Sequence, residues 1–392
     1  MTSPVDTSVK LAWSGMANAP VLNGQAGSLL GILDAVLVTG FDIKPLTGLT
    51  VSGGIATATF AGQHSAQADS VILIEGVTGA LAGLNGEQKV TARPTADTLT
   101  FATTEADGSA GGAITLKMAP AGWAKPFTNG NTAVYTSTDP LSLGMFLRVD
   151  DSSINVRVTG YENMGDADTG TGPFPSASMV SGGGYWNKSS KAGATAVPWV
   201  LAADSRMLLL WMAAYVPTNS SYNSGCVYAF GDLIALRPGG DAWAAILSCD
   251  IATATSQGGV EMCAPKAAVP RIFSGLGSSV WHYSCPYTGS NSNSVSGNDS
   301  TLGAFPNNIS GEMYFSRRFI ASGTTNPPRA DLPGLYTVPQ SGLLSYFKTG
   351  DTVAAAGTLQ GRNLFALISP QYTTWAAANQ CVAFIDQTGP WR

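Results

Sequence analysis

Residues 131–175 read NTAVYTSTDPLSLGMFLRVDDSSINVRVTGYENMGDADTGTGPFP. Three runs in this stretch, at 132–136, 144–150 and 154–161, are rich in the β-branched, aromatic and apolar residues that favour strands. Turn-forming residues separate the runs, and a loop rich in Gly, Asp and Pro follows the last one. The stretch therefore predicts a β-meander that leads into a long loop.

Apolar residues alternate with other residues along these runs. Met145, Leu147 and Val149 occupy every second position of the middle run, and Val156 and Val158 do the same in the next one. Successive side chains of a strand point to opposite faces of the sheet. Each strand is therefore expected to bury one face in a core.

The composition of the whole chain also favours strands. Charged residues make up only 11% of the 392 residues, whereas glycine alone contributes 46. Solvent-facing helices need Lys and Glu on their outer faces, so this composition disfavours long exposed helices and favours strands joined by many turns. A chain of this length also exceeds one ordinary core, which indicates several domains or one large β domain with insertions.

One helix is expected near the N-terminus, at 27–39. Its leucines follow helical spacing, Ser28 is of the residue type that caps helix N-termini, and Gly40 is placed to end the helix. Residues 1–20 show no such periodicity. We expect them to form an extended arm that is ordered mainly where a partner covers it.

The pattern changes to tight alternation at Leu49. Five or six short strands fit within residues 49–118, which is typical of a small barrel or sandwich inserted into a larger domain. The residues expected in its core are Val51, Ile55, Val71, Ile74, Val90, Leu99, Phe101 and Ile114. We expect this module to fold as a separate unit.

The flanks of the module, 1–48 and 119–392, supply the other predicted strands. Continuous apolar runs, such as 207–216, predict strands buried on both faces. Irregular Gly-rich and Ser-rich stretches at 165–198 and 286–308 predict long loops. The expected fold is mainly β: a large discontinuous β-sandwich-like domain with one N-terminal helix and a small inserted β-barrel or sandwich module.

Several short motifs follow one another inside the module. They are His64, the strand Asp69-Ser70-Val71-Ile72-Leu73-Ile74, Gly76, Leu84-Asn85-Gly86, Val90 and Thr98-Leu99-Thr100-Phe101. This order resembles a small β module that recurs in structural proteins of tailed bacteriophages, with a His-containing turn, a Val-x-Ile strand, a Gly turn, Leu-Asn-Gly and a Thr-rich strand. The chain departs from that family at Ala68-Asp69, where the family commonly has Gly-Asp.

The residues from 120 to 175 and the terminal stretch 384–392, FIDQTGPWR, also resemble tailed-phage virion proteins in style and order. The resemblance implies a non-catalytic structural component of the particle, associated with the tail, baseplate or fibre. It implies other virion proteins and copies of the chain itself, in a trimer or ring, as partners. The expected localisation is the virion, after assembly in the host cytoplasm.

Charge and hydropathy exclude several classes of protein. The net charge of −5 and the lack of basic runs argue against binding to nucleic acid or anionic membranes. The apolar run 207–216 is too short to span a bilayer. The first twenty residues lack the basic start and apolar core of a signal peptide, so secretion by that route is not expected.

The five cysteines are scattered and form no close pair, which is typical of buried thiols in a protein made in a reducing cytosol. Disulfides are the main alternative to reduced thiols. A zinc site built from His282 and Cys285 with Cys249 and Cys263 is a further alternative, although structural zinc sites normally use two close pairs. We expect no metal and no cofactor. His64, the other histidine, is expected to cap a turn.

Asp166 and Asp168 are the weak candidates for a metal site in this chain. Their spacing has the rhythm of a calcium loop, but the twelfth position of that loop is Ala177 rather than an acidic residue. The competing interpretation is an Asx turn, in which the carboxylate accepts hydrogen bonds from nearby backbone N–H groups. Both interpretations remain open from the sequence.

Two other functions compete with the structural one. A receptor-binding adhesin for host surface polysaccharide or protein would use exposed aromatic residues beside the long loops, and Tyr185, Trp186 and Tyr287 are the candidates. A polysaccharide-degrading tail enzyme would need two carboxylates facing each other across a cleft. We expect no enzyme, because no activated nucleophile or repeated depolymerase pattern is present in the sequence.

Overall fold

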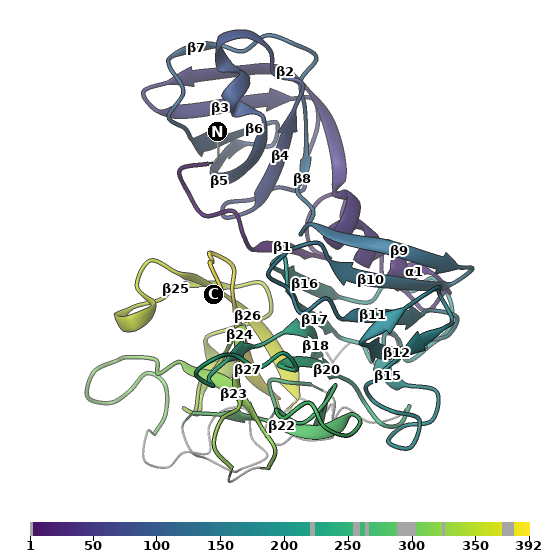
Figure 1. The fold of residues 1–392 in the computed structure, drawn as a ribbon. Helices are drawn as coiled ribbons and strands as arrows, with labels where there is room; N and C mark the ends of the chain where they lie inside the picture. The colour runs from purple at the N-terminus through teal and green to yellow at the C-terminus, as the bar shows by residue number, and fades with distance from the viewer. Residues whose placement is uncertain are drawn as a thin grey trace.

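The computed structural model describes residues 3–219, 224–253, 259–262, 266–287, 303–323, 326–370 and 380–392. The fold is mainly β, as predicted, with a large curled antiparallel sheet, a six-stranded barrel and one N-terminal helix of 12 residues. Figure 1 shows the barrel, in purple and blue, standing to one side of a larger body that contains the other sheets. The chain enters the barrel from the larger body and returns to it.

The large sheet forms the centre of the larger body. In spatial order its strands are β1 (Lys10–Trp13), β16 (Trp199–Ala203), β17 (Met207–Met212), β18 (Cys226–Asp232), β20 (Ala245–Ser248), β21 (Lys266–Val269), β22 (Val280–Pro286), β23 (Ser316–Ala321), β24 (Ala330–Thr337), β27 (Gln380–Asp386), β26 (Asn363–Pro370) and β25 (Thr352–Ala354), with β19 (Ile234–Ala235) paired to β24. Every residue of β17 and β18 is buried, which confirms the prediction from the continuous apolar runs.

A five-stranded sheet packs beside the large one. Its order is β15 (Gly184–Asn187), β12 (Asn155–Tyr161), β11 (Phe146–Asp150), β10 (Thr132–Ser137) and β9 (Trp123–Asn129). The three predicted strands of the meander are thus confirmed as β10, β11 and β12. Val156 and Val158 of this sheet belong to the same buried apolar cluster as Leu208 and Leu210 of β17, and Trp186 of β15 stacks on Tyr228 of β18, so the two sheets pack against each other.

The first predicted loop, 165–198, has more structure than its composition indicated. The two-residue strand β14 (Gly170–Thr171) pairs with β13 (Asn163–Met164), and β15 adds an edge strand to the five-stranded sheet. Gly184 and Trp186 of β15 are buried, and the strand pairs with the longer strand β12. Tertiary packing rather than local periodicity therefore determines the position of β15. The second predicted loop, 286–308, lies mostly outside the described residues.

The predicted helix at 27–39 is confirmed as α1 (Ser28–Leu33), which continues as a π-helical turn, η1 (Asp34–Thr39). The predicted cap is wrong. Gly27, in the left-handed region at φ 81°, is the N-cap, and the Asp151 carboxylate, distant in sequence, accepts hydrogen bonds from the first backbone N–H groups. Within the described part of the chain, no helix is long and apolar enough to cross a bilayer.

The inserted module forms the barrel. Its sheet has the order β3 (Ile55–Phe60), β6 (Thr98–Ala102), β5 (Gly86–Thr95), β4 (Val71–Glu75), β8 (Thr115–Met118), β2 (Phe41–Ser52) and β7 (Gly108–Ser109), and β3 also pairs with β2 to close it. A 3₁₀ helix, η2 (Gly79–Leu84), connects β4 to β5.

Two details of the module differ from the predictions. Its first strand, β2, begins at Phe41 rather than at Leu49. The first part of β2 pairs with β8 and the later part pairs with β3, with a register shift between Leu46 and Gly48. This irregularity interrupts the alternation of apolar residues in the sequence. Ile55 is 51% exposed, whereas the other residues expected in the core are buried. Independent folding of the module stays a prediction.

The N-terminal segment is part of the large sheet and does not form a free arm. β1 pairs with β16 over four residue pairs, from Lys10 with Ala203 to Trp13 with Val200. Val9, Ala12 and Met16 are buried in the main core. The expectation of an arm covered only by a partner is therefore wrong for these residues, whose apolar positions are buried within the same chain.

The barrel is attached to the larger body by specific polar contacts as well as by the chain itself. Lys10 Nζ lies 2.8 Å from Glu87 Oε2, and the buried Lys89 donates to the backbone carbonyl oxygen of Gln387 at 2.8 Å. Asn363 Nδ2 donates to Asp69 Oδ2 at 2.7 Å. These contacts join the barrel to both ends of the chain.

Candidate functional site

Trp186 cannot serve as a receptor contact, because its side chain is fully buried. The indole N–H donates to the backbone carbonyl oxygen of Ser248 at 2.8 Å, and the ring stacks on Tyr228 at a centroid distance of 5.7 Å. These contacts hold the five-stranded sheet against the large sheet. The prediction from its position beside a loop is corrected, since Trp186 belongs to strand β15, which pairs with β12 and directs the ring into the core.

Tyr185 and Tyr287 lie on different sheets. The half-buried Tyr185 ring is covered by the Arg157 guanidinium at 3.9 Å, whereas Tyr287 follows β22 and is 41% exposed. The Tyr287 hydroxyl donates to the Asp331 carboxylate, and burial together with that carboxylate raises the pKa of the phenol. The structure therefore does not bring the predicted aromatic contacts into one surface.

The Asp166 and Asp168 carboxylates are engaged by the protein. Asp166 Oδ1 accepts the backbone N–H groups of Asp168 and Thr169, each at 2.7 Å, which is the geometry of the Asx-turn interpretation. Asp168 accepts from Asn129 Nδ2 and from an Arg148 nitrogen, both at 2.9 Å. These hydrogen bonds hold the pKa of both carboxyls below the usual range.

No cluster of three His, Cys, Asp or Glu side chains converges in the ranges that the structure describes. Cys226, Cys249 and Cys285 are buried, and Cys263 lies outside the described residues. His64 accepts a hydrogen bond from the backbone N–H of Ala66 on Nδ1 at 3.0 Å, which fits the predicted turn.

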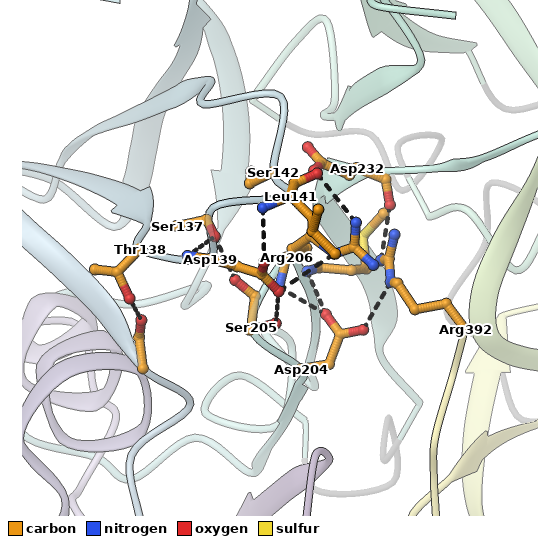
Figure 2. Close-up of polar contacts among 12 residues, drawn as sticks. Ser137, Thr138, Asp139, Leu141, Ser142, Asp204, Ser205, Arg206, Asp232 and Arg392 are labelled. Carbon is orange, nitrogen blue, oxygen red and sulfur yellow. Dashed lines mark hydrogen bonds and ion pairs between the residues drawn. The ribbon is translucent and has the colours of Figure 1, made fainter. Parts of the chain in front are cut away.

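A network of polar side chains anchors the last residue of the chain (Figure 2). Arg392 Nε donates to Asp204 Oδ2 at 3.0 Å, and its Nη2 donates to the backbone carbonyl oxygen of Asp232 at 2.9 Å. Asp204 Oδ1 in turn accepts the backbone N–H groups of Arg206 and Met207. The terminal arginine therefore fixes the turn between β16 and β17.

Asp139 lies on the other side of this network. Its Oδ2 accepts from the Ser205 hydroxyl at 2.6 Å and lies 3.5 Å from Arg206 Nε. The hydroxyl holds the pKa of Asp139 below its usual range, whereas burial raises the pKa of Asp232. The chain's two histidines lie in other strands and turns, so Ser205 has no imidazole base beside it. The network stabilises a junction of loops.

A cavity of about 620 Å³ is lined by residues that follow β19, by His282 of β22 and by the loop between β23 and β24. We call it the Phe273 pocket. Its exposed members are Leu236, Arg237, Phe273, Ser322, Asn326, Pro327 and Pro328. Phe273 is 56% exposed, and Arg237 places its guanidinium 4.7 Å from the centroid of that ring.

The buried members of the Phe273 pocket are Asp241, His282 and Arg329. Arg329 Nε donates to Asp241 Oδ2 at 2.7 Å and its Nη2 donates to Oδ1 at 3.1 Å, so the two charges neutralise each other in a bidentate pair. His282 Nε2 lies 3.3 Å from Arg329 Nη1. Because arginine only donates, Nε2 accepts in this contact and the ring proton is assigned to Nδ1.

Burial and the Arg329 cation lower the pKa of His282 to about 4. As pH falls below about 6.5, the histidine takes up a proton in the unfolded chain but stays neutral in the folded chain. The contribution of neutral, buried His282 to the free energy of unfolding is therefore complete above about pH 6.5 and is lost as pH falls toward 4. The stability of the native chain relative to the His282→Gln variant should therefore fall by about 3 kcal/mol between pH 7 and pH 4. Urea unfolding at several pH values measures this difference, and a difference that does not change with pH would contradict the assignment.

A second cavity, of about 440 Å³, lies beside the last strand of the large sheet. We call it the Phe305 groove. Its apolar lining residues are Phe305, Met313, Phe315, Phe347, Val353 and Leu359. Ile309, in the segment that follows Phe305, is 98% exposed, and Tyr346 is 54% exposed. Within the described residues β25 pairs with β26 alone, so in that part of the structure its outer edge has no partner strand.

The arrangement of carboxylates bears on the polysaccharide-degrading alternative. Among the described residues, one carboxylate lines the Phe305 groove, one lines the Phe273 pocket and one lines a small cavity beside Trp13, namely Glu312, Asp241 and Asp69 respectively. Asp241 is held by Arg329, and Asp69 accepts from Asn363. None of these cavities therefore presents the facing pair of carboxylates that glycoside hydrolysis uses. That the chain is not an enzyme stays a prediction.

Comparison with known proteins adds little to this picture. No protein-family model matches the chain, and no curated protein matches it. Among solved structures, one described as phage phi92 endosialidase has 11% sequence identity and a TM-score of 0.16, over 90% of this chain and 52% of that one. The chain thus spans about half the length of that structure. At this TM-score the likeness carries no argument about the fold or the function of this chain.

Proposed function

We propose that this chain is a non-catalytic structural component of a tailed-phage particle, in the tail, baseplate or fibre, and that it acts by assembling with copies of itself and with other virion proteins. The resemblance of the barrel motifs and of the terminal stretch 384–392 to tailed-phage virion proteins supports the setting. The localisation proposed is the virion, after assembly in the host cytoplasm.

The single observation that carries the assembly proposal is the Phe305 groove beside the open edge of β25. Aromatic and aliphatic side chains line it, and Ile309, in the segment between the lining residues Phe305 and Glu312, is almost fully exposed. Soluble monomers rarely leave such apolar surface and an unpaired strand edge uncovered together, because both drive association. With only 11% charged residues, the chain has few charges to keep copies apart.

Association through this surface would bury the groove and pair the backbone groups of β25. Strand addition at a sheet edge derives affinity from main-chain hydrogen bonds, and adjacent apolar side chains add specificity. A trimer suits a fibre, and a larger ring suits a baseplate or neck, because closed symmetry leaves no free interface. The groove is therefore the surface at which we place the contact between chains.

Replacing Ile309 by lysine should shift the native chain from oligomer toward monomer, because it places a charge in an interface that otherwise buries an apolar side chain. The matched control is Leu141→Lys, since Leu141 is 74% exposed on the loop between β10 and β11 and lies outside both the groove and the segment 305–315. Sedimentation velocity over a concentration series measures the effect. A native chain that stays monomeric at the highest concentration would contradict the assembly proposal.

A further inference from the structure

Arg237 differs from every other arginine of the chain. Each of the other ten donates at least one hydrogen bond from its guanidinium to the protein, and they are Arg93, Arg148, Arg157, Arg206, Arg271, Arg317, Arg318, Arg329, Arg362 and Arg392. Arg237 makes no side-chain hydrogen bond or ion pair within the described residues, and its guanidinium stacks on the Phe273 ring. Its five N–H donors are therefore available to a ligand.

The guanidinium of Arg237 is held against the wall of the Phe273 pocket, where it can meet a bound ligand. The stack on Phe273 restricts the guanidinium at little cost, and Arg237 is an exposed lining residue of the Phe273 pocket. The other ionised groups of the pocket, Asp241 and Arg329, cancel each other. The pocket thus carries one uncompensated positive charge in a chain of net charge −5, and it selects an anionic group.

The remaining lining combines apolar faces with a few hydrogen-bonding groups. Leu236, Phe273 and the two prolines give flat apolar surface. Asn326 Nδ2 donates to Ser322 Oγ at 2.6 Å, which leaves the amide carbonyl oxygen as an acceptor at the rim. His282 is neutral at physiological pH and 3% exposed, and its Nδ1 is a buried nitrogen with no hydrogen-bond partner in the described residues. Few, convergent polar groups on an apolar lining are the usual character of a small-ligand site.

We propose that the Phe273 pocket binds a sugar unit that carries a carboxylate. The carboxylate pairs with Arg237, the C–H face of the pyranose packs on the apolar wall, and hydroxyl groups bond at Asn326 and Ser322. A cavity of about 620 Å³ accommodates one or two such units. This binding goes beyond the structural role and does not depend on it, because every residue used belongs to one chain.

A tetramer of galacturonic acid is the probe, and maltotetraose, a neutral tetramer, is the comparison. Isothermal titration calorimetry on the full chain, in the oligomeric state in which it purifies, should detect the acidic tetramer and give at least tenfold weaker binding of the neutral one. Arg237→Met should weaken the acidic tetramer about 10- to 100-fold, the loss expected for one charge-assisted hydrogen-bonded contact. Added salt should weaken it as well.

Arg317→Met is the matched control. Arg317 also stacks on an exposed aromatic ring, that of Tyr287 at 5.2 Å, but it is paired with Asp331 and lies outside the pocket. Both arginines are exposed, so thermal melts should show that both variants fold. The control should bind the acidic tetramer as the native chain does.

Three results would overturn the proposal. They are no heat of binding for the acidic tetramer, equal affinities of the Arg237→Met variant and the native chain, and equal affinities for the acidic and neutral tetramers. Benzoate that displaces the acidic tetramer at equal concentration would show a site for any apolar anion and would overturn the assignment to a sugar. If the chain forms oligomers but does not bind the acidic tetramer, the sugar-binding proposal fails while the assembly proposal stands.

Discussion

The Asp151→Ala variant is expected to lose about 3–5 kcal/mol of the free energy of unfolding, the cost of removing one partner of a buried ion pair. Asp151 and Lys188 are both fully buried, and Lys188 Nζ donates to Asp151 Oδ1. Asp151 Oδ2 also accepts the backbone N–H of Leu29 at 2.7 Å and of Leu30 at 3.3 Å. The substitution leaves two helix N–H groups without their acceptor and a buried ammonium without its counter-charge, although Lys188 Nζ keeps the backbone carbonyl oxygen of Gln25 as an acceptor.

The directions of the pKa shifts agree with this burial. Desolvation raises the pKa of Asp151 and lowers the pKa of Lys188, while the contact between them opposes both shifts. The neighbouring Asp150 is a matched control, since its carboxylate accepts only from Ser152 in an exposed turn. Asp150→Ala should cost about 1 kcal/mol or less. Urea denaturation of the two variants measures the contrast, and equal midpoints would contradict a structural role for the buried pair.

Deletion of residues 1–16 is expected to cost about 5–9 kcal/mol, because it removes three large buried side chains worth about 1.5–3 kcal/mol each. These are Val9, Leu11 and Met16, and the deletion also uncovers the edge of β16. A loss of this size is comparable to the whole stability of many domains, so the truncated chain should lose cooperative unfolding or aggregate.

Deletion of residues 1–5 is the control for that truncation. Val5 is 38% exposed and precedes β1, so this shorter deletion should leave the unfolding midpoint nearly unchanged. Differential scanning calorimetry compares the two truncated chains with the native one. If the chain without residues 1–16 melts cooperatively at the native temperature, β1 does not belong to the core.

Elements with strong local periodicity could be predicted from the sequence. The alternation at 144–150 and 154–161 identified β11 and β12, and the leucine spacing at 27–39 identified the helix. The core of the barrel followed from the same alternation, with the exception of Ile55. Local pattern was sufficient here because each segment buries one face that its own sequence shows.

Long-range packing accounts for the elements that the sequence did not reveal. β1 and β15 are four-residue strands without an alternating pattern, and each is placed by a partner far away in the chain. The helix cap comes from Asp151 rather than from Ser28. Trp186 lies two residues after a run of three glycines, and this composition predicted an exposed loop. The strand that contains Trp186 instead pairs with β12 and buries the ring.

The two surfaces that carry the proposals were also beyond sequence reasoning. The Phe273 pocket joins residues near 237, 273, 282 and 327, which approach one another only in the folded sheet. The Phe305 groove joins the segment 305–315 with β25 and the turn after it. Neither set has a motif of fixed spacing, so no short-range signal marks them. The lack of a hydrogen-bonding partner for Arg237 likewise becomes visible only from the complete set of contacts.

A cryo-EM map of the purified particle, at side-chain resolution, tests the central claim most directly. The account predicts several symmetry-related copies of the chain in the tail, baseplate or fibre, with the Phe305 groove and the outer edge of β25 covered by a neighbouring chain. A particle that lacks the chain, or that contains it only as isolated copies with the groove open to solvent, would contradict the account.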